Sequence, residues 1–385
     1  QRQMCIRDRC YYVCLPKTES KPNIWSWLEG DIHSPQWLWG TKSAAATVTR
    51  RVDFIPASAK DKYNVNFIVG ILDAFNKKWS YLGQEIEKHY SHFYIPKKKL
   101  DEYGRVKWRE ICAPDDELSE ALKDLKEIFE AAGVSLHHTN AYAYVRHRTA
   151  SDAVSKHQYN HSRWWITTDF QNFFGNTTKE FLMSMMAQIF PFSAVIERDF
   201  GKECLSRALD LCFLNGGLPQ GTPISPMLTN IMMIPFDYMM TKKCREKDYI
   251  YTRYSDDIQV SHRRKFNPDE VLRFIHETLT QIHAPFTIEK EKTKFKSGNQ
   301  FVLGVMYNQN CDITVGHKNK KEFKATLFNY MCDRLSGKVW ELPQLQQMMG
   351  KYAYYSMIEK EYFENVMKEY SRKFKQLSLI HISEP

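Results

Sequence analysis

Apolar residues recur at helical spacing along much of the chain. The clearest stretch, Asp116–Ala131, has acidic residues in its first turn and apolar residues at Leu118, Leu122, Leu125 and Ile128. Asn267 is expected to cap another helix that opens with Pro268 and runs to residue 283. Helices are also expected over residues 63–89, 178–190, 319–335 and 342–373, and over a Met-rich segment that ends near residue 247 with a kink at Pro235.

Other stretches alternate apolar and polar residues and predict strands. Residues 249–261, "YIYTRYSDDIQVS", predict two strands around an Asp-Asp turn, with Ile250, Thr252 and Tyr254 on a buried face and the other face exposed. Residues 93–114 predict two short strands joined by a basic turn, and residues 163–170 and 301–308 predict one strand each. Because helices and strands mix along the chain, the predicted class is α+β.

Charge and cysteine content narrow the class of protein only slightly. The 385 residues carry a formal net charge of +9, which suits a nucleic-acid partner as well as an ordinary basic protein. Nine cysteines without metal-ligand spacing indicate reduced thiols rather than disulfides or a zinc site. No apolar run reaches the roughly 18–20 residues that span a bilayer. We therefore expect a cytoplasmic protein with no membrane partner.

The two ends of the chain differ from the rest. The sequences "QRQMCIRDR" and "SLIHISEP" resemble translated sequencing-adaptor sequence. Residues 1–10 and 378–385 are therefore expected to be artefact and are set aside. Residues 11–62, rich in Trp, Pro and Ser, are expected to form an irregular N-terminal extension.

Asp256 and Asp257 are the first candidate for chemistry. An Asp-Asp pair in a turn is ordinarily just solvated, but two adjacent carboxylates repel each other and suit a divalent cation. Asp169, at the end of the strand predicted over residues 163–170, would supply a third carboxylate if the two strands pair. Three such carboxylates can hold the two metal ions used in phosphoryl transfer.

Three segments together resemble the reverse transcriptases. "TTDFQNFF", "GGLPQGTPISPMLTN" and "YSDD" occur in the order of that family, within a resemblance that covers roughly residues 94–330. The resemblance implies a right-hand polymerase fold with fingers over residues 63–160, a palm with an antiparallel sheet backed by helices over 161–310 and a helical thumb over 311–377. It also implies RNA-templated DNA synthesis from dNTPs with two Mg²⁺ ions, for which Mn²⁺ is a possible substitute.

The resemblance also assigns roles to single residues. Asp169, Asp256 and Asp257 match the catalytic, metal-binding aspartates, and the Phe170 carbonyl would help to hold metal. The implied nucleotide site consists of Arg109, Lys99, Phe174, Gln220, Gly221 and Lys292, and the implied primer grip consists of Leu303 and Gly304. Phe174 would exclude ribonucleotides, unless it is an ordinary core residue. Lys97 and Lys98 remain alternatives to Lys99, and this run of three lysines could simply be solvated. Lys290 and Lys294 remain alternatives to Lys292.

The implied partners are an RNA template, a DNA or RNA primer and dNTPs, with a cognate structured non-coding RNA as a further candidate. The motifs are similar to retron, group II intron and defence-associated enzymes. Where retron enzymes carry Val-Thr-Gly, this chain has Val302-Leu303-Gly304, and "AVSKH" at residues 153–157 matches their upstream element in part. Two other functions stay open: template-independent or protein-primed DNA synthesis, and non-catalytic RNA binding by the same fold.

Overall fold

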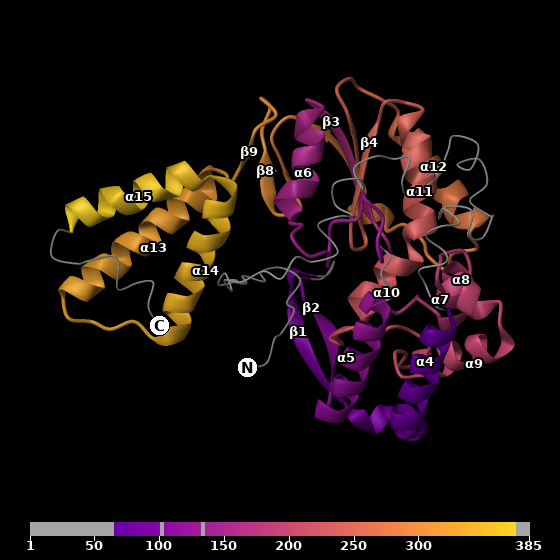
Figure 1. Cartoon of the computed structure of the whole chain (residues 1–385). Helices are drawn as coiled ribbons and strands as arrows, with labels where there is room; N and C mark the ends of the chain where they lie inside the picture. The colour runs from indigo at the N-terminus through magenta and orange to yellow at the C-terminus, as the bar shows by residue number, and fades with distance from the viewer. Residues whose placement is uncertain (1–64, 101–103, 132–134, 375–385) are drawn as a thin grey trace. The chain divides into compact units, whose positions relative to one another are not determined.

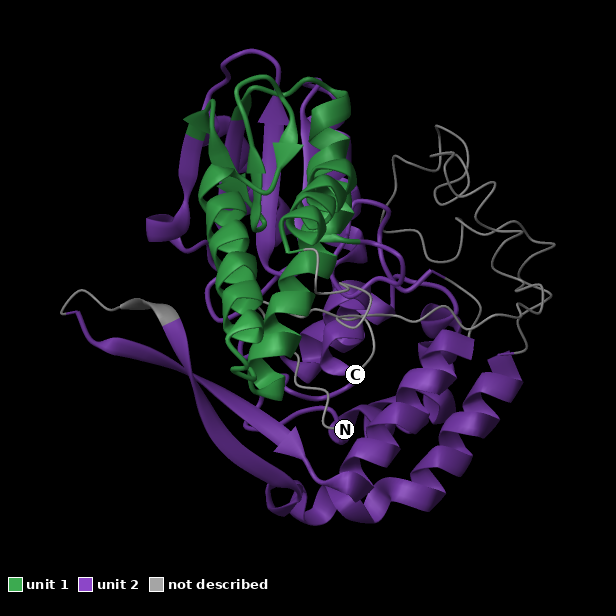
Figure 2. Cartoon of the chain, turned by 90° about the vertical axis from the view of Figure 1, so that its left-hand side faces the viewer, with its two compact units in different colours: residues 1–19, 149–164, 296–385 green, residues 20–148, 165–295 purple. Residues whose placement is uncertain are grey.

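The computed structural model describes residues 65–100, 104–131 and 135–374, without the side chains of residues 98–100. The two expected artefact segments and the N-terminal extension lie outside these ranges. The described residues form two compact units, drawn in different colours in Figure 2. Residues 149–164 and 296–374 belong to unit 1, and the other described residues belong to unit 2. These units are groups of residues that pack compactly together and do not correspond to fingers, palm and thumb, so the bounds of those three parts stay a prediction.

Unit 2 combines a helical part with the strands that carry the aspartates (Figure 1). Its α-helices are α4 (Val65–Trp79), α5 (Asp116–Ala131), α7 (Lys179–Met186), α8 (Phe192–Ile196), α9 (Asp199–Asp210), α10 (Ser225–Met232), α11 (Ile234–Arg245) and α12 (Pro268–Gln281). The 3₁₀ segments are η2 (Ser80–His89) and η3 (Lys290–Lys292).

The start of α12 follows its sequence signal, whereas the helices predicted over residues 63–89 and 178–190 end earlier, at Trp79 and Met186. The Asn267 side chain accepts a hydrogen bond from the Asp269 N–H and caps α12, as expected. The Met-rich segment is divided at Met233 into α10 and α11, and Pro235 lies in the first turn of α11. A proline there is tolerated because its missing N–H would have no partner within the helix.

A long antiparallel hairpin projects from unit 2. Strand β1 (Tyr90–Leu100) pairs with β2 (Val106–Pro114), and the register sets His92 opposite Cys112 and Ile95 opposite Arg109. Both strands predicted in residues 93–114 are therefore present, and β1 begins three residues earlier than expected at Tyr90.

A second sheet carries the predicted metal-binding strands. Its order is β4 (Ile250–Tyr254), β5 (Asp257–His262), β3 (Trp164–Asp169) and β6 (Lys294–Ser297). Helix α11 contacts β4 and lies beside α12 (Figure 1). The alternation predicted for β4 is wrong: Tyr251 and Arg253, expected on an exposed face, are 2% and 0% exposed. The reason is that α11 and residues 140–142 cover the strand.

Unit 1 contains α6 (Ala150–Tyr159), a three-stranded sheet and a helical end. The sheet has the order β7 (Gln300–Val302), β8 (Val305–Tyr307) and β9 (Ile313–Thr314), and α6 contacts β8 and β9. Helices α13 (His317–Leu335), α14 (Leu342–Ile358) and α15 (Lys360–Lys373) enclose a core around Phe323, Leu327 and Phe363. The single helix predicted over residues 342–373 is thus divided at Glu359, whose carboxylate accepts hydrogen bonds from the Val315 N–H and Lys320.

None of the helices in the described residues combines the length and the apolar composition that a bilayer crossing requires.

Candidate active site

The end of β3 lies against the turn between β4 and β5. Tyr254 pairs with Asp257 across this turn, which leaves Ser255 and Asp256 at its tip. The Phe170 N–H donates to the Asp256 carbonyl over 3.3 Å, so the residue after Asp169 is joined to the first aspartate of the pair. The end of β3 and the β4–β5 turn are therefore neighbours, as the three-carboxylate hypothesis requires.

The aspartates are more buried than the sequence suggests. Asp169 and Asp256 are 6% and 4% exposed, whereas Asp257 is half-buried. An Asp-Asp pair in a turn is ordinarily solvated, but Asp256 is not. The reason is the sheet order, which places β5 between β4 and β3 rather than at an edge.

Lys292 provides a positive charge beside the first aspartate. Its Nζ lies 2.8 Å from Asp169 Oδ2 and also contacts the Glu289 carboxylate. Although burial lowers the pKa of Lys292, hydrogen bonds to Asp169 and Glu289 raise it above the usual value for lysine. The Lys292 ammonium group thus compensates the charge of a buried carboxylate. The contact favours Lys292 over Lys290 and Lys294 as the lysine of the predicted nucleotide site.

A buried ion pair supports the aspartate turn from behind. Arg253 and Asp237, both fully buried, are joined by two hydrogen bonds of 2.8 Å, from Arg253 Nε to Asp237 Oδ1 and from Nη2 to Oδ2. Arg253 Nη1 donates to the Ser255 carbonyl over 2.8 Å, and the Tyr251 hydroxyl donates to Asp237. Burial alone would lower the pKa of Arg253, but Asp237 raises it, so the guanidinium stays charged.

Sequence reasoning missed this pair. Its only signal is a charged residue in an apolar setting: Asp237 stands in the Met-rich helix and Arg253 at a position that strand alternation predicts to be solvated. Ser255 has a φ of +61°, an uncommon conformation for a residue other than glycine, and its carbonyl is one of the groups that Arg253 holds. The pair therefore fixes the backbone that presents Asp256.

The predicted nucleotide loop lies against Phe174. The Leu218 N–H donates to the Phe174 carbonyl over 3.0 Å, and the Phe174 side chain is 8% exposed. A Cβ atom added to Gly217 would lie 2.4 Å from the Gly175 carbonyl oxygen, so the two backbones require glycine for their close approach. The structure thus brings Phe174 and the "LPQG" loop together.

The same loop contacts the β1–β2 hairpin. The Cys112 N–H donates to the Gln220 carbonyl over 2.8 Å. Gly221 has a φ of +125°, and a Cβ there would lie 2.7 Å from the Cys112 carbonyl oxygen. Only glycine fits this position, and the hairpin therefore stands directly beside Gln220 and Gly221.

Positive charges converge near this contact. Burial is the largest cause that lowers the pKa of Lys97, followed by the charges of Arg109 and Lys292. Three cations therefore share one region of unit 2. The prediction of Lys99 falls on a residue whose side chain is not described, whereas the charge of Arg109 acts on Lys97.

Comparison with known proteins identifies the family. A family model for reverse transcriptase (RNA-dependent DNA polymerase) matches residues 95–327. The chain belongs to this family. Family membership confirms the predicted fold class, the right-hand α+β fold, and the predicted enzyme class, RNA-directed DNA polymerase. Enzymes of this family use an RNA template, a nucleic-acid primer and divalent metal ions.

This reverse transcriptase is similar to three bacterial retron enzymes. Retron Ec83 reverse transcriptase of Escherichia coli is 27% identical over 301 residues, which cover 73% of this chain and 89% of the relative. Retron Ec73 reverse transcriptase of the same species is 25% identical over 63% of this chain and 78% of the relative. Retron Se72 reverse transcriptase of Salmonella heidelberg (strain 579083-10) is 23% identical, over 63% of this chain and 61% of the relative.

Two solved telomerase structures resemble the reverse transcriptase more distantly. Apo telomerase from Candida tropicalis gives a TM-score of 0.41 at 13% identity, over 80% of this chain and 64% of that chain. Telomerase from Candida albicans with a fragment of telomeric RNA gives a TM-score of 0.38 at 12% identity, over 76% of this chain and 61% of that chain. This chain thus spans less than two thirds of either telomerase chain.

The predicted primer grip of the reverse transcriptase lies in unit 1. The strand expected over residues 301–308 is instead a tight hairpin, with Leu303 and Gly304 as the two turn residues between β7 and β8. Their φ values of +51° and +86° suit a type I′ turn, which demands positive φ at both central positions. The continuous-strand prediction is wrong because the turn combines a leucine with a single glycine and lacks the usual Asn-Gly signal.

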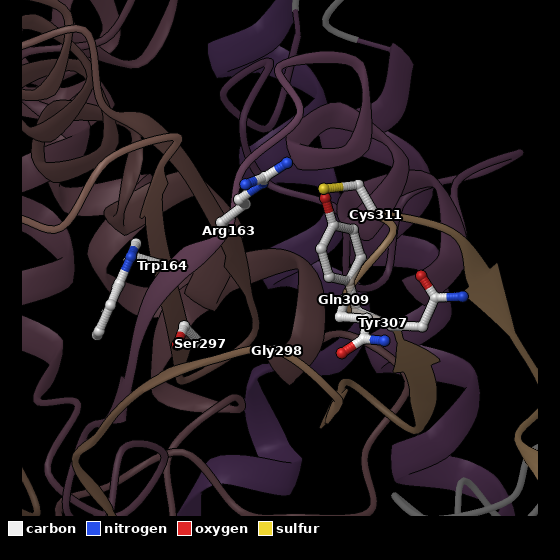
Figure 3. Close-up of a pocket in the computed structure, with 8 residues that line it drawn as sticks. Arg163, Trp164, Ser297, Gly298, Tyr307, Gln309 and Cys311 are labelled. Atoms are coloured by element: carbon white, nitrogen blue, oxygen red, sulfur yellow. The ribbon is translucent and has the colours of Figure 1, made fainter.

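Unit 1 also contains a pocket (Figure 3). It is lined by Arg163, Trp164, Ser297, Gly298, Tyr307, Asn308, Gln309 and Cys311, and the Tyr307 hydroxyl lies beside the Cys311 thiol. No predicted site residue contributes to it.

Proposed function

We propose that this reverse transcriptase extends the 3′-hydroxyl of a DNA or RNA primer with dNTPs on an RNA template, at Asp169, Asp256 and Asp257. The observation that carries the proposal is the hydrogen bond from the Phe170 N–H to the Asp256 carbonyl, since it joins the ends of two separate strands at their aspartates. Asp169 and Asp256 are both buried, and two buried carboxylates on neighbouring segments would repel each other less with divalent cations between them.

The donor set fits Mg²⁺. Carboxylate oxygens, with the Phe170 carbonyl, are the hard oxygen ligands that this ion prefers, and Mn²⁺ accepts the same set. Lys292 against Asp169 is a further sign that the carboxylate cluster attracts positive charge. When bound, two such ions would lower the pKa of the 3′-hydroxyl and neutralise the leaving pyrophosphate.

The chain's own residues then have defined roles. Gln220 and Gly221 would form the surface under the incoming nucleotide, where the loop is fixed by the Cys112 N–H. Phe174 would close the sugar site against a 2′-hydroxyl, and faster ribonucleotide incorporation by Phe174→Val would test this role. Arg109, with Lys99 or Lys97, would bind the triphosphate, since Arg109 already lowers the pKa of Lys97 and a polyanion would relieve that repulsion. Leu303 and Gly304 would contact the primer end.

The decisive experiment replaces one aspartate. Asp256→Asn keeps the size of the side chain and removes its charge, so primer extension on an RNA template should fall at least 1000-fold, on the order of the loss expected for a metal ligand. Thermal unfolding should occur within a few degrees of wild type. Asp269→Asn, an exposed aspartate in the first turn of α12, is the matched control and should keep wild-type activity. Extension by Asp256→Asn at the wild-type rate would falsify the assignment.

For the biological setting, we infer a retron-like enzyme that acts with a cognate structured RNA. The similarity to three retron reverse transcriptases supports this setting. Sequencing the DNA made by the purified enzyme, with RNA that co-purifies from its native host, tests it. Products that copy one structured RNA are expected. Products made equally well without template would instead indicate template-independent or protein-primed synthesis, and RNA binding without metal-dependent incorporation would indicate a non-catalytic protein.

A further inference from the structure

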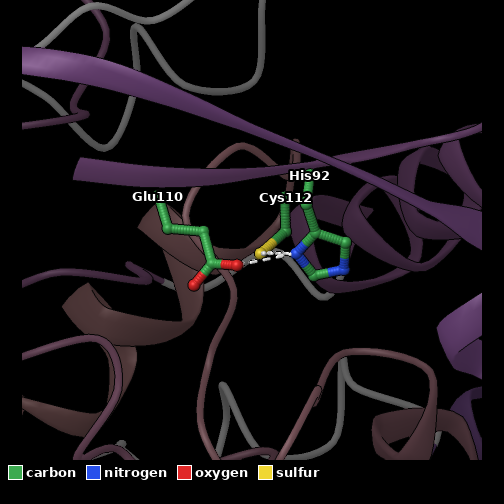
Figure 4. A group of neighbouring side chains, drawn as sticks. All are labelled: His92, Glu110 and Cys112. Carbon is green, nitrogen blue, oxygen red and sulfur yellow. Dashed lines mark hydrogen bonds and ion pairs between the residues drawn. The ribbon is translucent and has the colours of Figure 1, made fainter. Parts of the chain in front are cut away.

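Three potential metal ligands converge on one face of the β1–β2 hairpin (Figure 4). His92 pairs with Cys112 across the strands, and Glu110 lies two residues before Cys112 on the same face of β2. Nδ1 of His92 lies 2.8 Å from Oε1 of Glu110 and 3.7 Å from Sγ of Cys112. One ligand atom from each residue thus lies within 4.8 Å of the others.

These distances suit a tetrahedral zinc centre. With Zn–N and Zn–O bonds of about 2.0–2.1 Å and a Zn–S bond of about 2.3 Å, ligand atoms lie about 3.3–3.6 Å apart. The distance of 3.7 Å between Sγ and Nδ1 lies about 0.1 Å beyond that range. The distance between Nδ1 and Oε1 is that of a hydrogen bond and would need to open by about 0.5 Å. Because the His92 and Glu110 side chains are 39% and 49% exposed, this small adjustment is unhindered.

The nature and exposure of the ligands indicate which ion fits. A thiolate, an imidazole and one carboxylate form a borderline-soft set, which selects zinc-class ions over Mg²⁺. Cys112 is 8% exposed and closes one side, while the exposed His92 and Glu110 leave the other side open to water. Three protein ligands and one open position characterise an exchangeable zinc site rather than a closed structural one.

We propose that His92, Glu110 and Cys112 bind one Zn²⁺ ion, with water as the fourth ligand. Sequence spacing cannot reveal this site, because His92 and the other two residues lie on different strands and meet only through the hairpin register. The site is distinct from the aspartate centre in both its residues and its donor chemistry.

Zinc at this site would also affect the nucleotide loop, an inference that rests on the proposed function. The Cys112 backbone binds the Gln220 carbonyl and lies against Gly221. An ion that fixes Cys112 therefore also fixes the strand on which the loop rests. We expect zinc to stabilise the hairpin and to lower the KM for dNTP rather than to change kcat.

Zinc binding is tested directly, with metal alone as the probe. The test uses the full chain with Cys5→Ser, Cys10→Ser and Cys14→Ser as its reference protein, so that thiols outside the described residues do not bind the metal. The buffer contains millimolar Mg²⁺, which occupies the carboxylate sites and keeps Zn²⁺ from binding there. A competing chromophoric chelator should report one tight Zn²⁺ equivalent, and Co²⁺ in its place should give the near-ultraviolet thiolate charge-transfer band. Cys112→Ser should abolish the band and weaken Zn²⁺ at least tenfold, and His92→Gln and Glu110→Gln should weaken it similarly.

The control variant changes a cysteine outside the proposed zinc site. Cys332→Ser, at an exposed cysteine of unit 1, should leave both the affinity and the band unchanged. Equal Zn²⁺ affinity of wild type and Cys112→Ser, or retention of the band, overturns the proposal. Asp256→Asn should bind Zn²⁺ normally, so loss of polymerase activity and loss of this site are separate outcomes. If Zn²⁺ binds but leaves the KM for dNTP unchanged in wild type, the site stands and its coupling to the loop is refuted.

Discussion

At the scale of single residues, the aspartate turn depends on a charge pair that never meets solvent. Arg253 donates to Asp237, to the Asn230 side chain and to the Ser255 carbonyl, and thereby joins α10, α11 and the tip of the β4–β5 hairpin. A buried pair of this kind adds little net stability over an apolar pair, but the loss of one partner leaves a buried charge uncompensated.

Asp237→Asn should therefore destabilise the protein by about 3–5 kcal/mol, measured by denaturant unfolding. The double variant Asp237→Leu/Arg253→Met, which buries no charge, should recover much of that loss. Asp73→Asn is the matched control, since its partner Lys77 is a surface residue four positions away and the change should cost less than about 0.5 kcal/mol. A loss below about 1 kcal/mol in Asp237→Asn would contradict the role of the pair.

Lys292 permits a second test at this scale. If it donates a proton to the leaving pyrophosphate, Lys292→Met should lower kcat by about 100-fold, within the range for a general acid. Because Asp169 and Glu289 raise its pKa, the group stays protonated throughout neutral and mildly alkaline pH, so wild-type kcat should not fall through its titration below about pH 9.

Lys294→Met, two residues away and exposed, should stay within about twofold of wild type because its change removes no contact to Asp169. Single-turnover kinetics distinguish the two variants. An unchanged kcat in Lys292→Met would contradict proton donation by this lysine.

At the scale of elements, local patterns predicted most helices and failed where distant contacts decide. The α5 bounds follow from apolar spacing and the α12 start from its cap, both of which are local signals. The break at Glu359 arises from its hydrogen bonds to Val315 and Lys320, more than thirty residues earlier, which no window of sequence contains. Likewise, the aspartates were predictable from motifs, whereas Arg253 was not, because its burial depends on Asp237.

The β7–β8 turn places a leucine in a conformation that leucine avoids. Positive φ at Leu303 costs about 1–2 kcal/mol for such a side chain, and asparagine tolerates it better. Strain of this kind indicates that the residue is kept for something other than stability.

Leu303→Asn should therefore leave unfolding unchanged or raise stability by about 0.5 kcal/mol, while primer extension weakens several-fold through a higher KM for primer–template. His283→Asn serves as the control, since His283 has a similar φ of +53° in unit 2 and should leave extension unaffected. Wild-type extension by Leu303→Asn would exclude a primer contact at this position.

At the scale of the whole molecule, the net charge of +9 does not show which lysines are available to nucleic acid, because some of them are paired within the fold. On α13, Lys320 lies 2.6 Å from Glu359 and 4.2 Å from the Tyr362 ring, whereas Lys318 and Lys321 are exposed. The exposed pair is therefore the part of this helix suited to phosphate.

Lys318→Ala/Lys321→Ala should reduce the salt dependence of RNA–DNA duplex binding, lowering the slope of log K against log salt by about 1.5–2. Fluorescence anisotropy over roughly 50–200 mM KCl measures this slope. Lys320→Ala should instead lower thermal stability and leave the slope unchanged. A slope unaffected by the double variant would show that α13 does not contact the nucleic acid.

The discontinuity of unit 1 has a consequence for how such enzymes can be recombined. Helix α6 precedes the aspartate strands in the sequence, yet it contacts β8 and β9, and Cys311 contacts the Ser162 carbonyl. A chimaera that takes only its C-terminal region from another reverse transcriptase would pair a resident α6 with foreign strands. Residues 149–164 and 296–374 therefore form one module of exchange, and a crossover between relatives preserves its packing only when both segments come from the same parent.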